Sequence, residues 1–144
     1  MAGIRINNGA KKIEVNDSGD YIILNLNDND FLNRFYSMYE NVQKTADEMA
    51  AKETAIQEKQ KDKEDNAELL KETFRLYTEF GKDMMSEVDG LFGDGTCKKV
   101  FGDIAPTIDL YIDFFEQLVP YLNDFAKEKM QRMSKYSAAR RGNV

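Results

Sequence analysis

The sequence contains no histidine, and this absence removes several classes of catalytic site. Ser-His-Asp and Cys-His catalysis, histidine-ligated zinc and carboxylate-histidine di-iron sites all need that side chain. No convergent nucleophile, base and orienting group can be assembled from the residues that remain. We therefore expect a protein that is not an enzyme and that uses no cofactor and no metal.

Cysteine is nearly absent, and long apolar runs are absent as well. The single Cys97 cannot form an intramolecular disulfide, which is typical of a reducing cytosolic compartment. "MAGIRINNGA" has no apolar core of a secretory signal. "IDLYIDFFEQLVPYL" is interrupted by Asp113 and Glu116 and is too short to span a bilayer. We expect a soluble, cytoplasmic protein that does not bind a membrane.

The net charge of -6 is unevenly distributed. From Lys127 onward the sequence contains six basic residues and one acid, Glu128, so this end carries +5 and the rest carries -11. Phosphate binding needs a basic footprint, and the acidic body therefore disfavours nucleic acid as a partner.

The length of 144 residues predicts one domain, residues 1–144, of the α+β class and mainly α. Residues 1–27 are predicted to form a small antiparallel β-meander. "IRIN" and "KKIEVN" alternate around Asn8-Gly9, and the turn "NDSGD" leads into "YIILNLN", where Ile22, Leu24 and Leu26 share a face. Residues 28–136 are predicted to form a bundle of three long helices, followed by a flexible basic tail at 137–144.

The first two helices are marked by apolar residues at a spacing of three and four. The first is capped from within 28–30, and its stripe is Phe31, Phe35, Met38, Val42, Ala46 and Met49. Residues 57–66 hold no apolar side chain and form either a helical extension or a bend. The second helix has the stripe Ala67, Leu70, Phe74, Tyr77, Gly81, Met84, Val88 and Leu91. This stripe predicts the seam of an intramolecular helical hairpin, with an intermolecular coiled coil as the alternative.

The third helix is predicted to begin after Ala105, with Pro106 near its first turn. Pro120 falls on its polar strip, which also contains Asp109, Asp113 and Glu116. Nothing else converges on these acids, so we interpret them as a solvated face and not as a cation site.

The loop "GLFGDGTCKKVFGD", residues 90–103, is rich in glycine but matches neither a phosphate loop nor a calcium loop. It is better explained as a hinge, in which Gly90 or Gly93 ends a helix and "TCKKVF" forms one short turn that Gly102 terminates. Cys97 lies beside two lysines, which could lower its pKa. Without a histidine partner, we expect an inert thiol.

Two segments resemble a known family. "KKIEVNDSGDYIILNLNDNDFLNRFYSMYENV" and "CKKVFGDIAPTIDLYIDFFEQLVPYL" are similar to small proteins encoded among the tail genes of phages and prophages of Gram-positive bacteria, commonly described as tail assembly chaperones. The shared features are Asn16-Asp17, Gly19-Asp20, Phe31, Phe35, Val100-Phe101-Gly102, Phe114-Phe115 and Pro120-Tyr121. The resemblance implies a protein in the cytoplasm of the bacterial host that coats the long, apolar, helical tape-measure protein without a cofactor.

A binding surface follows from this resemblance as a hypothesis, with Phe101, Phe114, Phe115, Leu118, Tyr121 and Leu122 as its protein-binding residues. The alternative is that all six fill the core, because buried aromatic side chains are the default. Methionines such as Met84, Met85, Met130 and Met133 suit either a core or an adaptable interface. Three alternatives stay open for function and assembly: a structural tail or head completion component, a small acidic inhibitor of a host protein, and a homo-oligomer.

Overall fold

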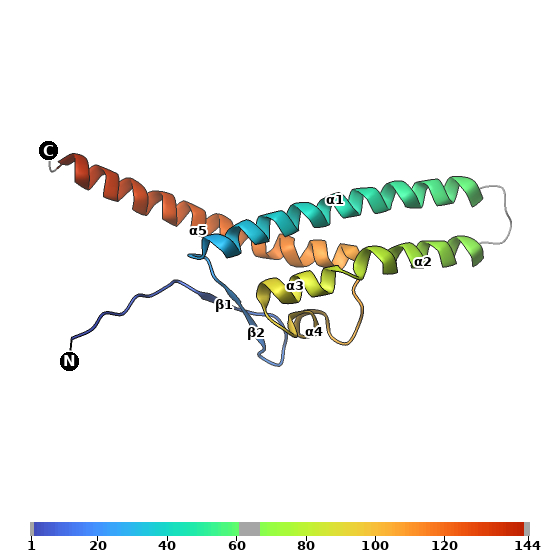
Figure 1. The fold of residues 1–144 in the computed structure, drawn as a ribbon, viewed down its shortest axis with the longest axis horizontal. Coiled ribbons are helices and arrows are strands. Elements are labelled where there is room, and N and C mark those ends of the chain that lie inside the picture. Colours follow the sequence, from blue (N-terminus) through green and yellow to red (C-terminus); the bar gives the residue numbers. More distant parts are fainter. Residues whose placement is uncertain (1, 61–66, 143–144) are drawn as a thin grey trace. The chain divides into compact units, whose positions relative to one another are not determined.

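The computed structural model describes residues 2–60 and 67–142 of the chain. Its elements are β1 (Lys11–Glu14), β2 (Tyr21–Leu24), α1 (Asn29–Gln60), α2 (Ala67–Gly81), α3 (Met84–Phe92), α4 (Thr96–Phe101) and α5 (Ile108–Gly142) (Figure 1). The fold is α+β and mainly α, as the sequence predicted. The chain divides into two compact units, Met1–Ile112 and Asp113–Val144, with the boundary inside α5.

The β-strands form one antiparallel hairpin in which Ile13 pairs with Ile22 and Lys11 with Leu24. The Asn16 carboxamide oxygen accepts hydrogen bonds from the backbone N–H groups of Ser18 and Asp20, which fixes the predicted turn. Ile22, Leu24 and Leu26 are all buried, so the predicted alternation of the second strand is confirmed.

The strand predicted at "IRIN" is wrong, because residues 2–10 form no strand. Ile4 and Ile6 are exposed. The side chains of Asn7 and Asn8 accept hydrogen bonds from the N–H groups of Gly9 and Ala10. These local bonds offer the backbone an alternative to a sheet ladder. These residues make local side-chain bonds, and neither the predicted hairpin turn nor its first strand forms.

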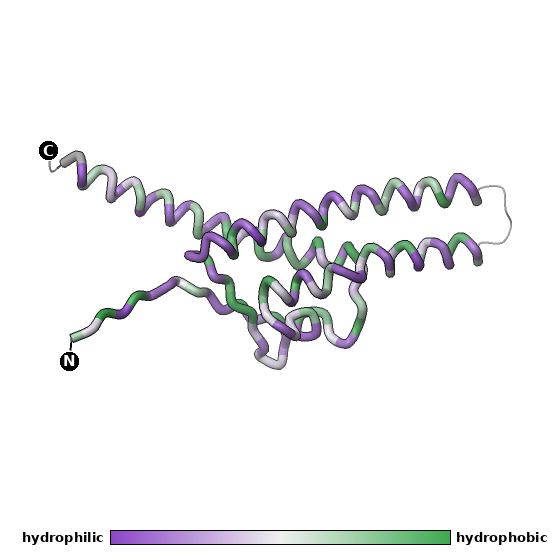
Figure 2. Tube along the Cα trace, in the orientation of Figure 1, coloured by the Kyte–Doolittle hydropathy of each residue, from purple (hydrophilic) through white to green (hydrophobic). Residues whose placement is uncertain are grey.

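Helix α1 begins as predicted, with the Asp28 carboxylate accepting a hydrogen bond from the N–H of Asp30 at 2.9 Å. Its stripe buries Phe31, Phe35 and Val42. The helix continues through Gln60, so residues 57–60 are helical. The other residues for which the sequence allowed either a helix or a bend, 61–66, lie outside the described residues. Figure 2 shows that hydrophilic residues predominate along α1, whereas hydrophobic residues recur on α2 and α3.

The predicted second helix is in fact two helices, because α2 ends at Gly81 and α3 begins at Met84. Gly81 has a weak helical preference and lies close to the next segment, since a Cβ built on it would be 3.2 Å from the Pro106 carbonyl oxygen. The break therefore divides the predicted stripe between two helices. Met84, Val88 and Leu91 of the stripe are buried in α3.

In α2 the residues that are buried differ from those that the predicted seam contains. Leu70 and Phe74 are exposed, whereas Leu76, from the flank of the stripe, is buried. Helices α1 and α2 still pack against each other, as the predicted intramolecular hairpin requires, and lie side by side in Figure 1. The Tyr77 hydroxyl donates a hydrogen bond to Glu53 of α1 within this pair. Three of the eight stripe residues, Ala67, Leu70 and Phe74, are therefore exposed.

The glycine-rich loop is the predicted hinge. Gly93 (φ 120°) ends α3, Gly95 (φ 83°) precedes α4, and Gly102 follows α4. Positive φ values of this kind suit glycine because it has no Cβ. The Asp89 carboxylate accepts hydrogen bonds from the N–H groups of Gly95 and Cys97, at 3.3 and 2.9 Å. Asp89 therefore caps the short helix across the loop, a role that the spacing of the sequence did not reveal.

Helix α5 starts at Ile108 and not directly after Ala105, and Pro106 lies buried just before it. The helix includes Pro120, whose side chain is exposed as predicted. A proline on the solvated side is easier to accommodate, since the carbonyl that it leaves without a partner can bind water.

Candidate functional site

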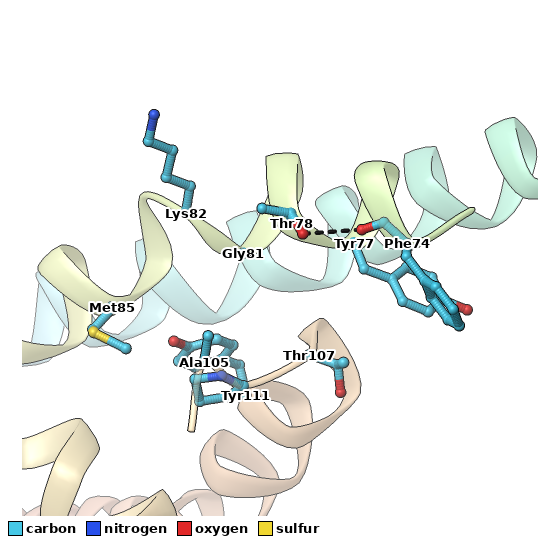
Figure 3. Close-up of a pocket in the computed structure, with 10 residues that line it drawn as sticks. Phe74, Tyr77, Thr78, Gly81, Lys82, Met85, Ala105, Thr107 and Tyr111 are labelled. Carbon is cyan, nitrogen blue, oxygen red and sulfur yellow. Dashed lines mark hydrogen bonds between the residues drawn. The ribbon is translucent and has the colours of Figure 1, made fainter. Parts of the chain in front are cut away.

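The unit Met1–Ile112 contains a groove with a volume of about 410 Å³. One side is formed by α2 and the start of α3, and the other by residues 105–107 and the first turn of α5 (Figure 3). We call it the α2 groove. Its lining residues are Phe74, Tyr77, Thr78, Gly81, Lys82, Met85, Ala105, Pro106, Thr107 and Tyr111.

The α2 side of the groove is formed by residues that share one face of the helix. Phe74, Tyr77 and Gly81 are separated by three and four residues, so they fall on one face of α2. Gly81 lets residues 105–107 approach closely, as its short distance to the Pro106 carbonyl shows. In Figure 3 the side chain of Met85 points toward Ala105, whereas that of Lys82 points away from the groove. The surface inside is consequently made mainly of aromatic, methionine and proline carbon.

Apolar side chains at and beside the groove are exposed to an unusual degree. Phe74 is 59% exposed, Ile104 is 53% exposed, and Leu70, one helical turn before Phe74, is 52% exposed. Single exposed apolar residues are normal, but a group of them beside an apolar groove is typical of an interaction site.

The polar groups at the groove are already engaged or face outward. Tyr77 donates to Glu53, and this hydrogen bond, together with burial and the charges of Glu53 and Asp109, raises the pKa of the Tyr77 hydroxyl. The Thr78 hydroxyl donates to the Phe74 carbonyl at 3.0 Å (Figure 3). The arrangement suits binding of apolar surface beside negative charge, and it does not assemble a nucleophile with a base.

Tyr111 connects the groove to the buried Cys97. Tyr111 is fully buried, and its hydroxyl makes no hydrogen bond of normal geometry within the described residues. The Cys97 thiol is its polar neighbour, and sulfur is a weak acceptor. Burial, followed by the charge of Asp89, raises the pKa of the Cys97 thiol from 9.0 to about 12. Lys98 and Lys99 therefore do not lower the pKa of the Cys97 thiol, and its burial favours the predicted inert thiol.

Alkaline pH is expected to destabilise the protein through Cys97. Between pH 9 and 12 the unfolded chain loses the thiol proton while the folded chain keeps it, so the stability from this group is complete below pH 9 and falls above it. At about pH 10 the loss is roughly 1.4 kcal/mol relative to neutral pH. Urea unfolding at about pH 8 and about pH 10 measures it.

The Cys97→Ala variant is the control for this effect. It lowers stability at both pH values through the lost side chain, but its change in free energy of unfolding between them is expected to be smaller than that of the wild type by about 1 kcal/mol. Equal changes in both proteins would contradict the assignment to Cys97.

The structure separates the six predicted binding residues into two classes. Phe114, Phe115, Leu118 and Leu122 are buried, whereas Phe101 and Tyr121 are partly exposed. A partner could contact the four buried side chains only after a rearrangement, so their burial favours the alternative that they fill the core. The Phe101 ring lies edge-on to the Tyr111 ring, with centroids 5.2 Å apart. None of the six lines the α2 groove.

Several residues of the α2 groove belong to a clear pattern in the sequence, but the pattern predicts a different role for them. Phe74, Tyr77 and Gly81 belong to the stripe that predicts a seam between helices. One signal could have identified them: Leu69, Leu76 and Phe80 widen the apolar face of α2 beyond what one packing contact needs. Met85 and Ile104 gave no periodic signal, because each lies beside a break between elements.

Neither a metal site nor a membrane span is found in the part of the chain that the structure describes. Within residues 2–60 and 67–142, no three acidic or cysteine side chains group in a way that could hold a metal ion. No helix in the same ranges has the length and apolar character needed to cross a bilayer.

Comparison with known proteins identifies a family. Residues 18–143 match the model of a family of unknown function (DUF6673), and the chain belongs to this family. No curated protein and no solved structure matches it.

Proposed function

We propose that this protein is a non-enzymatic tail assembly chaperone of a phage, which binds apolar helical segments of the tape-measure protein in the α2 groove. The observation that carries the proposal is the apolar groove with Phe74 exposed at its edge. The phage context comes from the resemblance of the two sequence segments described above.

The groove has the features of a site for an amphipathic helix. Such helices bind by placing side chains at a spacing of three and four into an apolar groove. Phe74 and Tyr77 offer aromatic surface, and Met85 offers a flexible side chain that adapts to different partners. A chaperone of a long repetitive helix needs this adaptability, because many different segments must fit one site.

The charges of the protein suit the same role. The acidic excess of residues 1–126 keeps a complex with an apolar client soluble. The negative charges of Glu53 and Asp109 beside the groove also favour client helices with basic residues next to their apolar face.

Co-expression with the tail genes of the phage tests the proposal. Tagged wild-type protein is expected to retain the tape-measure protein at many copies per client chain, as identified by mass spectrometry. A Leu70→Ser/Phe74→Ser variant is expected to retain less than about a tenth as much, because the two truncated apolar contacts, at the groove edge and one helical turn before it, together cost about 1.4 kcal/mol or more. Circular dichroism confirms that the variant is folded.

The matched control is Ile4→Ser/Ile6→Ser, which removes two exposed apolar side chains far from the groove in sequence. It is expected to bind the client as the wild type does. Recovery of tube, head or host proteins in place of the tape-measure protein would contradict the chaperone proposal. Such a result would favour the structural component or the acidic inhibitor.

A further inference from the structure

The last part of α5 presents a second exposed apolar surface. All side chains from residue 126 to residue 140 are exposed. Met130, Met133 and Tyr136 follow each other at intervals of three residues and are 74%, 57% and 58% exposed. Residues with this spacing lie along one side of a helix. We call residues 127–140 the C-terminal segment.

The C-terminal segment and the α2 groove are complementary in charge. The segment carries five basic residues, Lys127, Lys129, Arg132, Lys135 and Arg140, and one acid, Glu128. The groove lies in the acidic part of the chain, and the charges of Glu53 and Asp109 act on Tyr77 at its wall. Lys82, a basic residue of the lining, points away from the groove (Figure 3).

The two surfaces also match in the kind of apolar side chain that they offer. Methionine and tyrosine on the segment can enter a groove walled by Phe74, Tyr77 and Met85, where sulfur–aromatic contacts are favourable. The groove is open within the unit Met1–Ile112, and the side chains of the segment are exposed.

We infer that the C-terminal segment of one copy docks in the α2 groove of a second copy, with Met130, Met133 and Tyr136 inserted and with Arg132 and Lys135 toward Glu53 and Asp109. The contact is head-to-tail: each copy offers one groove and one segment. A contact of this type builds rings or open chains of copies and not only dimers. It goes beyond client binding and requires no client.

Sedimentation velocity on the purified protein over a wide concentration range tests the inference. The wild type is expected to form species larger than a dimer as concentration rises, and high salt is expected to weaken them because the charge attraction is screened. A groove variant, Phe74→Ser/Met85→Ser, and a segment variant, Met130→Ser/Met133→Ser/Tyr136→Ser, are each expected to stay monomeric.

Mixing the two variants gives the decisive result. The intact segment of the groove variant can still enter the intact groove of the segment variant, so the mixture is expected to form a 1:1 dimer that does not grow further. Two results would overturn the inference. Self-association of the groove variant would indicate a contact between two C-terminal segments. Absence of a dimer in the mixture would show that the segment does not enter the groove.

A charge variant tests the same contact if one of the apolar variants fails to fold. Arg132→Glu/Lys135→Glu changes only exposed side chains, and it is expected to weaken association about tenfold, because it replaces two attractive charges by repulsive ones. Unchanged association of this variant, or a wild type that is monomeric at every concentration, would contradict the docking. Because no client is present, these results are independent of the tape-measure pull-down.

Discussion

Replacing Tyr111 by alanine is expected to lower the free energy of unfolding by about 3 to 5 kcal/mol, the usual cost of removing a fully buried aromatic side chain. The ring is 0% exposed and packs edge-on against Phe101. The substitution leaves a cavity between the α2 groove and Cys97, which the surrounding helices can fill only in part. Urea unfolding followed by circular dichroism measures the loss.

The Tyr111→Phe variant separates the ring from the hydroxyl. The buried hydroxyl has no hydrogen bond of normal geometry within the described residues, so its removal is expected to leave stability unchanged or to raise it by up to about 1 kcal/mol. A loss of more than about 1 kcal/mol would mean that the interaction with the Cys97 thiol is worth more than a weak sulfur contact.

Replacing Phe35 by alanine is expected to have an effect of similar size, about 3 to 5 kcal/mol. Phe35 is 0% exposed, and its ring contacts the rings of Phe31, Tyr39 and Phe92. Aromatic contacts of this kind add to the loss of buried area. The free energy of unfolding, measured as for Tyr111, is expected to fall without loss of helical content at low urea.

The matched control is the same truncation at an exposed site, Phe74→Ala. It is expected to change the free energy of unfolding by less than about 1 kcal/mol, because the Phe74 ring already contacts water. Equal effects of the two variants would contradict the burial of Phe35 or the exposure of Phe74. A small effect at Phe74 would also show that the groove edge is not needed for folding, as a binding surface requires.

The elements that the sequence predicted well are those in which local chemistry and packing agree. The Asn16 turn, the Asp28 cap and the glycine hinge at 93–102 all depend on contacts between residues close in the chain. Residues Ile22, Leu24 and Leu26 were assigned correctly, because alternation in a strand has only two phases. For such features the pattern alone decides the structure.

The errors occurred where tertiary contacts decide between local alternatives. A stripe with helical spacing shows that residues share a face, but it does not show which neighbour covers that face. In α2 the predicted seam residues Leu70 and Phe74 are exposed, whereas the flanking Leu76 is buried. The candidate site was missed for the same reason. The groove forms only when residues 105–107, which are remote in sequence, come beside α2.

The Asn16 side chain has a consequence beyond the turn that it holds. Its amide nitrogen also donates to the Lys99 carbonyl of α4 at 3.0 Å, across 83 residues of sequence. Local opening of the hairpin therefore also removes a partner from the end of α4. Regions joined in this way open as one cooperative unit. The amide protons of the hairpin and of α4 should accordingly exchange with solvent deuterium together, although they lie at opposite ends of the first unit's sequence.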